Sequence, residues 1–173
     1  MVGADGNLSL RHGEGMLVTP SRLAYDRTDP EDIVWVGADG RPQGRQPPSS
    51  EWALHAAVYA ARPDVSAIVH AHPLYACVLA VRGEPLPALL EEVGPVLGGP
   101  VAIAEYAPSG TPDVGRVAVA ALGTDRFGVI LARHGTATVG ADLETAFYRL
   151  EVLERAAAVY VLSGLRGRLT SST

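Results

Sequence analysis

The spacing of apolar and polar residues along the 173-residue chain predicts an alternation of strands and helices. Short apolar runs bounded by turn residues predict five strands, at residues 8–11, 16–18, 33–36, 65–69 and 127–131. Longer segments of good helix formers predict four helices, at residues 52–61, 73–82, 111–122 and 143–162. No internal repeat is found, and this order of elements indicates an α/β sandwich around a mixed sheet.

The length of the chain is typical of one domain, so residues 1–173 are expected to form a single domain. Residues 37–48 are rich in glycine and proline and are expected to form an exposed loop. Residues 83–99 are too interrupted by the same two residue types to be assigned, and residues 166–173 are expected to be frayed.

Composition excludes several classes of function. The net charge is −5 and all 14 basic residues are arginines without a basic cluster, which argues against nucleic-acid binding. The chain lacks lysine, so no side-chain amine can form a Schiff base with a carbonyl substrate. Cys77 is the only cysteine, so no internal disulfide forms and a cytoplasmic location is expected. No signal peptide or membrane-spanning run is recognised, and no membrane partner is expected.

Three histidines form the strongest chemical signal. His70 and His72 follow the apolar run 65–69, and alternate side chains of an extended segment point to the same face. His134 follows the second apolar run, 127–131. Three imidazoles with an open fourth position are typical of a catalytic zinc ion. The alternative is that these are ordinary histidines satisfied by hydrogen bonds.

A carboxylate lies at the predicted start of the first helix. Glu51 follows Ser49 and Ser50, which are candidates for the helix N-cap. Glu51 is either a helix-capping residue or a proton-transferring group. The two serine hydroxyls and the free N–H groups at a helix start would also form a pocket that suits a phosphate or a carboxylate. A carboxylate beside an anion pocket and a divalent metal suits deprotonation next to a carbonyl. His55, one helical turn later, either orients Glu51 or is a core residue.

Five segments together resemble the class II aldolase/adducin family, and most of all its L-fuculose-phosphate aldolase branch. They span nearly the whole chain in the family's order: GNLSLR (6–11), TPSR (19–22), PSSEWALH (48–55), ARPDVSAIVHAHP (61–73) and ARHGTATVG (132–140). The resemblance implies a three-layer α/β/α sandwich with a central mixed, largely antiparallel sheet. It implies a homotetramer that acts on a small sugar phosphate.

The same resemblance implies the roles of individual residues. His70, His72 and His134 would bind one Zn²⁺ per subunit, and Glu51 would be the general acid/base. The phosphate site would be lined by Asn7, Ser21, Ser49 and Ser50.

The chain departs from the branch in three places. Arg22 stands where the phosphate loop of the branch has glycine, and it would bind phosphate more tightly, favour a carboxylate or crowd the pocket. Glu91 stands where the branch has a tyrosine proton donor, so Glu91, the nearby Tyr106 or another residue would supply the second proton. The family's usual N-terminal helix and C-terminal tail are not found in this sequence, which leaves aldehyde recognition open.

The resulting expectation is a zinc-dependent aldehyde-lyase. It would reversibly cleave a small sugar phosphate to dihydroxyacetone phosphate, or a similar hydroxycarbonyl, and an aldehyde. The alternatives are another reaction of the superfamily, namely pentose-phosphate 4-epimerisation, dehydration or decarboxylation, and a non-catalytic adducin-like domain.

Overall fold

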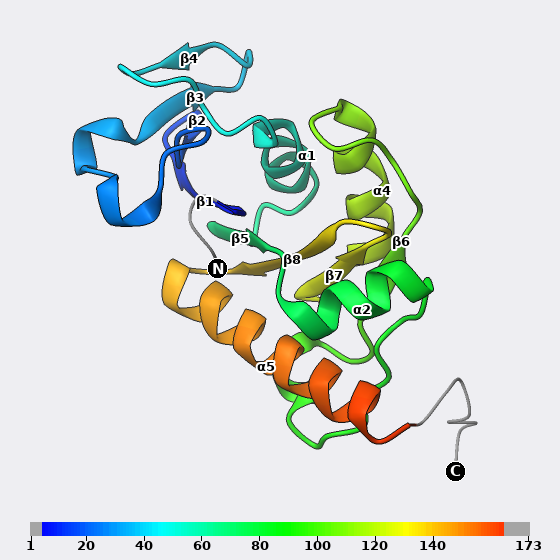
Figure 1. Ribbon diagram of the computed structural model, residues 1–173. Helices are drawn as coiled ribbons and strands as arrows, with labels where there is room; N and C mark the ends of the chain where they lie inside the picture. Colours follow the sequence, from blue (N-terminus) through cyan, green and yellow to red (C-terminus); the bar gives the residue numbers. More distant parts are fainter. Residues whose placement is uncertain (1–4, 165–173) are drawn as a thin grey trace.

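The computed structural model describes residues 5–164, so the expectation of a frayed tail at 166–173 falls outside the described residues. One eight-stranded sheet runs through this part of the chain, in the order β4-β3-β2-β1-β5-β8-β7-β6 (Figure 1). The β6–β7 pair is parallel and the other pairs are antiparallel, which confirms the mixed, largely antiparallel sheet. The strands are β1 (Asn7–His12), β2 (Gly15–Val18), β3 (Val34–Gly37), β4 (Pro42–Gln43), β5 (Ala67–Ala71), β6 (Ile103–Ala104), β7 (Gly128–Leu131) and β8 (Gly135–Gly140).

Helices cover both faces of the sheet. Figure 1 shows α1 and α4 on one side and α2 and α5 on the other. The α-helices are α1 (Trp52–Ala61), α2 (Leu74–Arg82), α3 (Val93–Leu97), α4 (Pro112–Leu122) and α5 (Leu143–Leu162), with short 3-10 helices at η1 (Tyr25–Arg27) and η2 (Pro30–Asp32). One core cluster joins α1 and α4 to the sheet and a second joins α2, α3 and α5 to it, so the three-layer sandwich is confirmed. Within residues 5–164, no helix combines the length and apolarity needed to cross a bilayer.

The predicted helices and strands are all present, with ends shifted by up to two residues. Besides the two short 3-10 helices, three strands and one α-helix were not predicted, and the most important is β8, which lies between β5 and β7. Its sequence is composed of glycine, alanine, threonine and one valine, so it lacks the apolar run of a buried strand. Thr136 and Thr138 are nevertheless fully buried, because their hydroxyls donate to the carbonyls of Val129 (2.7 Å) and Ala146 (2.8 Å). The others are β4, α3 and β6, which lie in segments rich in proline and glycine.

Helix α1 begins at Trp52 as predicted, but its N-cap residue differs from the prediction. Ser49 and Ser50 were expected to cap the helix, but the N-cap residue is Glu51. The backbone N–H of Glu51 donates to Ser49 Oγ (3.2 Å), and the N–H of Trp52 donates to Ser49 O (3.1 Å). The serines therefore form the turn before the helix, and Glu51 stands at the helix end that faces the sheet.

Two glycines allow the strand ends to approach one another closely. Gly6 has a φ of 79°, and a Cβ there would collide with the carbonyl of His70. At Gly135 a Cβ would collide with the ring of His72 and the carbonyl of Ala71. Larger residues at these two positions would push β1 and the β7–β8 turn away from the end of β5.

Candidate metal and anion site

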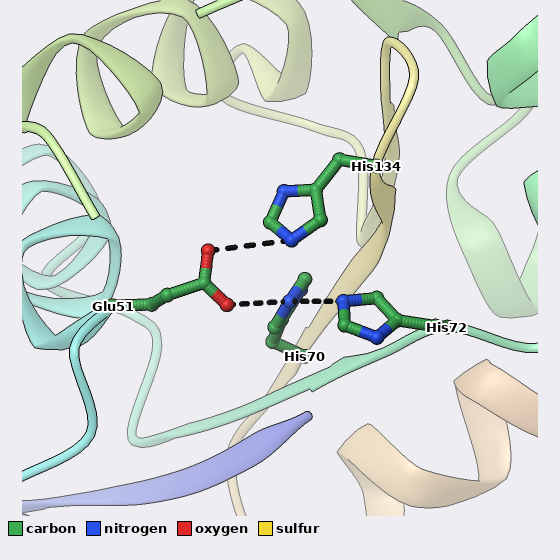
Figure 2. Close-up of side chains that lie close together, drawn as sticks. All are labelled: Glu51, His70, His72 and His134. Atoms are coloured by element: carbon green, nitrogen blue, oxygen red, sulfur yellow. Dashed lines mark hydrogen bonds and ion pairs between the residues drawn. The ribbon is translucent and has the colours of Figure 1, made fainter. Parts of the chain in front are cut away.

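The three predicted histidines come together at the ends of interior strands of the sheet. His70 and His72 lie at the end of β5, and His134 lies in the turn between β7 and β8. Their ring centroids are 4.8 to 4.9 Å apart. Figure 2 shows Glu51 reaching the same point from the start of α1. One ligand atom from each of the four residues lies within 4.8 Å of the other three.

The carboxylate of Glu51 is buried and held by four neighbours. Oε2 lies 2.8 Å from His70 Nε2 and Oε1 lies 3.4 Å from His134 Nε2 (Figure 2). The hydroxyl of Ser109 donates to Oε1 (2.9 Å), and the amide of Asn7 donates to Oε2 (3.4 Å). Burial raises the pKa of Glu51, but the hydrogen bond and the charge of His70, aided by His134 and Ser109, outweigh it and lower that pKa to about 2. Glu51 is therefore ionised at neutral pH.

The contacts of the two ring nitrogens of His70 are those expected of a metal ligand. His70 Nδ1 lies 3.0 Å from the carbonyl of Thr136, which can only accept, so Nδ1 carries the proton. A proton on Nε2 would bond Glu51 Oε2, 2.8 Å away, and a metal ion would take the place of that proton, next to the Nε2 atom of His72 at 3.0 Å. Ligand atoms that converge in this way, two of them on the buried residues Glu51 and His70, suit a cation between them. A ligand histidine whose other nitrogen donates to a backbone carbonyl is the usual arrangement at metal sites.

The other two histidines also suit this role. Burial and the charge of His70 lower the pKa of His72, and the same causes lower the pKa of His134 to about 4. Both rings are therefore neutral at neutral pH and can offer a lone pair. The donor set of three imidazoles and one carboxylate fits a divalent transition metal ion.

A cavity of about 300 Å³ opens next to the cluster. It is lined by all four residues predicted for phosphate, Asn7, Ser21, Ser49 and Ser50, and also by Glu51, His72, Arg22, Asp5, Gly6 and Pro20. The exposed Arg22 has a φ of 59°, and within residues 5–164 its guanidinium forms no ion pair or hydrogen bond. Hydroxyls, an amide and an unpaired guanidinium are suitable donors for an anion.

The family model for the class II aldolase and adducin N-terminal domain matches residues 1–161. The chain belongs to the class II aldolase and adducin family. Among its relatives, a 5-methylthioribulose-1-phosphate/5-deoxyribulose-1-phosphate aldolase of Rhodospirillum rubrum is 40% identical over 158 residues, which cover 91% of this chain and 71% of that protein. An L-fuculose phosphate aldolase of Escherichia coli is 32% identical over 159 residues, covering 92% and 74%.

Solved structures of the class II aldolase family agree with this result. An L-fuculose 1-phosphate aldolase matches with a TM-score of 0.93 and 36% identity, covering 100% of this chain and 82% of that one. A putative aldolase/epimerase/decarboxylase of Klebsiella pneumoniae matches with a TM-score of 0.85 and 29% identity, covering 95% and 82%. The resemblance to class II aldolases and the expectation of a metal-dependent enzyme of this family are confirmed.

The two alternative proton donors lie outside the cluster. Glu91 is exposed in the turn before α3 and is not part of the group formed by Glu51 and the histidines. Tyr106 is 59% exposed, and its ring lies under the guanidinium of Arg133, 5.3 Å from ring centroid to Cζ. Neither is among the four neighbours that hold the Glu51 carboxylate.

Ser109 contacts Glu51, and the sequence did not identify it. Ser109 precedes α4, and the close packing of α4 on α1 brings it to Glu51; a Cβ at Gly115 of α4 would collide with Ala57 of α1. No local pattern around Ser109 indicates this contact. For His55 the sequence left two roles open, and the structure buries the ring completely and bonds it to Asn7.

Proposed function

We propose that the protein is a metal-dependent aldolase that reversibly cleaves a small sugar phosphate to dihydroxyacetone phosphate, or a similar hydroxycarbonyl, and an aldehyde. One observation carries the proposal: four ligand atoms from Glu51, His70, His72 and His134 converge beside a cavity rich in donors. Metal chemistry and anion binding are the two requirements of such a reaction. The Rhodospirillum rubrum relative and the L-fuculose 1-phosphate aldolase structure act on ketose 1-phosphates by name, which supports a substrate of that class.

The proposed metal is one Zn²⁺ per subunit, held by His70, His72 and His134. Imidazole nitrogen is a preferred zinc ligand, and three protein ligands leave a coordination position for substrate. A bound divalent cation supplies Lewis acidity toward the oxygens of a hydroxycarbonyl. Because the chain has no lysine, this chemistry would replace an imine as the electron sink.

Glu51 is the proposed acid/base. In the condensation direction its carboxylate removes a proton from the carbon next to the carbonyl, and in the cleavage direction it returns that proton. Ser109 and Asn7 bind one carboxylate oxygen each, which fixes the plane of the group. The carboxylate is ionised before substrate arrives, so it is in the form that accepts a proton.

The phosphate would bind in the cavity beside Glu51. Ser49 Oγ already accepts the N–H of Glu51, so its hydroxyl hydrogen remains available to a phosphate oxygen. Ser21, Ser50 and the second amide hydrogen of Asn7 add further donors, and Arg22 adds a positive charge. This combination favours a phosphorylated donor substrate over an unphosphorylated one.

The test is to supply the purified protein with fuculose 1-phosphate, 5-deoxyribulose 1-phosphate and methylthioribulose 1-phosphate, and to assay dihydroxyacetone phosphate. We expect release with at least one substrate, loss on chelation and recovery on adding Zn²⁺. An epimerase or a dehydratase would consume a sugar phosphate without releasing this fragment, and a decarboxylase would release carbon dioxide. Stoichiometric metal would be absent from a non-catalytic domain, and that result would reject the proposal.

We further propose that the chain forms a single domain, assembles as a homotetramer and acts in the cytoplasm. Light scattering of the purified protein would give the mass of the assembly, and a monomer would reject the tetramer.

A further inference from the structure

Behind Glu51, four polar side chains form a continuous line of hydrogen bonds through the core. Tyr59 Oη lies 2.8 Å from Ser9 Oγ, and Ser9 Oγ lies 2.6 Å from His55 Nδ1. His55 Nε2 contacts Asn7 Oδ1 at 2.5 Å, and Asn7 Nδ2 reaches Glu51 Oε2 at 3.4 Å. The four side chains are 0 to 6% exposed, so water does not compete for these contacts.

The Asn7 amide sets the direction of every bond in this line. Its NH₂ group donates to Glu51 Oε2, and its oxygen, which only accepts, faces His55. His55 Nε2 therefore carries the proton, and Nδ1 is the acceptor. Ser9 must then donate to Nδ1, and it accepts in turn from Tyr59.

The imidazole of His55 is well suited to hold this arrangement. Burial and the charge of His70 lower the pKa of His55 to about 3, although Glu51 opposes the shift. The ring is therefore neutral throughout the physiological range. Its acceptor side is occupied by Ser9, so it cannot exchange tautomers without breaking a buried bond.

Asn7 connects this line to the substrate cavity. It begins β1, pairs with His70 of β5 in register, and lines the cavity. One amide hydrogen goes to Glu51 and the other remains for an anion. A reversed amide would point its oxygen at the carboxylate and at any bound phosphate, and the Nε2–H of His55 opposes that reversal.

We propose that His55 is a positioning residue, which holds the Asn7 amide with its NH₂ group toward Glu51 and the anion cavity. The consequence for catalysis rests on the proposed function, whereas the tautomer and the orientation of Asn7 do not. His55 touches neither substrate nor metal and acts only through Asn7.

Two substitutions separate positioning from packing. His55→Gln keeps one acceptor and one donor at the same site, whereas His55→Leu keeps similar bulk and removes both. We expect His55→Leu to weaken binding of inorganic phosphate about tenfold, the worth of about one hydrogen bond, and to raise KM for the phosphorylated substrate by a similar factor. His55→Gln should recover most of the loss.

Val58→Ala is the matched control, since Val58 is buried on the same helix and is not part of the line. It should lower the melting temperature without changing phosphate affinity. A loss of affinity in Val58→Ala as large as that in His55→Leu would mean that the effect is only structural, and would overturn the proposal. Unchanged affinity in His55→Leu would overturn it too.

A direct measurement needs no variant. In the zinc-loaded protein with ¹⁵N-labelled histidine, two-bond proton–nitrogen spectra should show His55 as the Nε2–H tautomer from pH 6 to pH 8. An Nδ1–H tautomer or an imidazolium would overturn the proposal, even if His55→Leu does not fold. If the protein cleaves no sugar phosphate, the proposed function fails while this measurement still decides the role of His55.

Discussion

Arg22 combines a left-handed backbone with a guanidinium that forms no ion pair or hydrogen bond within residues 5–164, so replacing it should leave stability nearly unchanged but weaken phosphate binding. Its φ of 59° places it in the left-handed region, where the backbone conformation of a residue other than glycine is about 1 kcal/mol less favourable than that of glycine. Arg22→Gly removes that strain, but it also increases the conformational entropy of the unfolded chain, which lowers the free energy of unfolding by about 0.4–1 kcal/mol. The two effects nearly cancel, so the free energy of unfolding should change by less than about 0.5 kcal/mol.

The effect on phosphate should be much larger. A hydrogen bond to a charged group contributes about 1.5–3 kcal/mol, and the exposure of Arg22 argues for the lower end of that range. We therefore expect Arg22→Gly to lower the affinity for inorganic phosphate about tenfold, as measured by isothermal titration calorimetry at low salt. The difference from the wild type should shrink as salt is added, because exposed charges are screened.

Arg22→Gln provides the control, because it removes the charge and keeps a side chain on the strained backbone. It should lose phosphate affinity as Arg22→Gly does, without the change in backbone strain. If both variants bind phosphate as well as the wild type, the guanidinium does not serve the anion cavity. Tighter binding in Arg22→Gly would mean that the side chain crowds the cavity instead.

Three further predictions concern Glu51, His134 and the carboxylate of Asp32. Glu51→Gln should abolish proton exchange between dihydroxyacetone phosphate and deuterated water while the metal stays bound, and NMR of the recovered substrate measures it; continued exchange would remove Glu51 from the mechanism. His134→Ala should release the metal, as measured by plasma emission spectrometry after dialysis, and full retention would place the third ligand elsewhere. Asp32 accepts hydrogen bonds from Arg45, the backbone of Asp29 and Gln46, which lower its pKa to about 2. Because that pKa is lowered on folding, its contribution to stability is present above its ordinary pKa near 4 and is lost as the pH falls through 2. Thermal melts should show Asp32→Asn less stable than the wild type from pH 5 to pH 7 and equal to it near pH 2, whereas a constant gap would contradict this assignment.

The group formed by Glu51 and the three histidines could be predicted from the sequence because its geometry follows from local rules. The two-residue period of a strand puts His70 and His72 on one face, and a strand end followed by a tight turn positions His134. Among the cavity residues, Ser49 and Ser50 were indicated by their place before a helix, and Asn7 and Ser21 by the family resemblance. Glu51 was selected by its place at a helix start, although the structure makes it the N-cap residue itself.

The parts that were missed depend on contacts between distant segments. β8 has too few large apolar residues to be recognised, and its threonines are buried only because carbonyls of neighbouring elements accept their hydroxyls. Ser109 reaches Glu51 across 58 positions through the packing of two helices. His55 meets Asn7 across 48 positions, so its two possible roles were separable only in three dimensions.

The neighbouring strands β5, β8 and β7 have a consequence for how this protein can change. His70 lies in β5, His72 directly follows that strand and His134 lies in the turn between β7 and β8, whereas Glu51 lies at the end of a separate helix. The proposed metal ligands and the proposed acid/base therefore belong to different elements of the fold. Exchanging the residue at the helix end would alter the chemistry while the strands would still position the three histidines, so new reactions could arise here one part at a time.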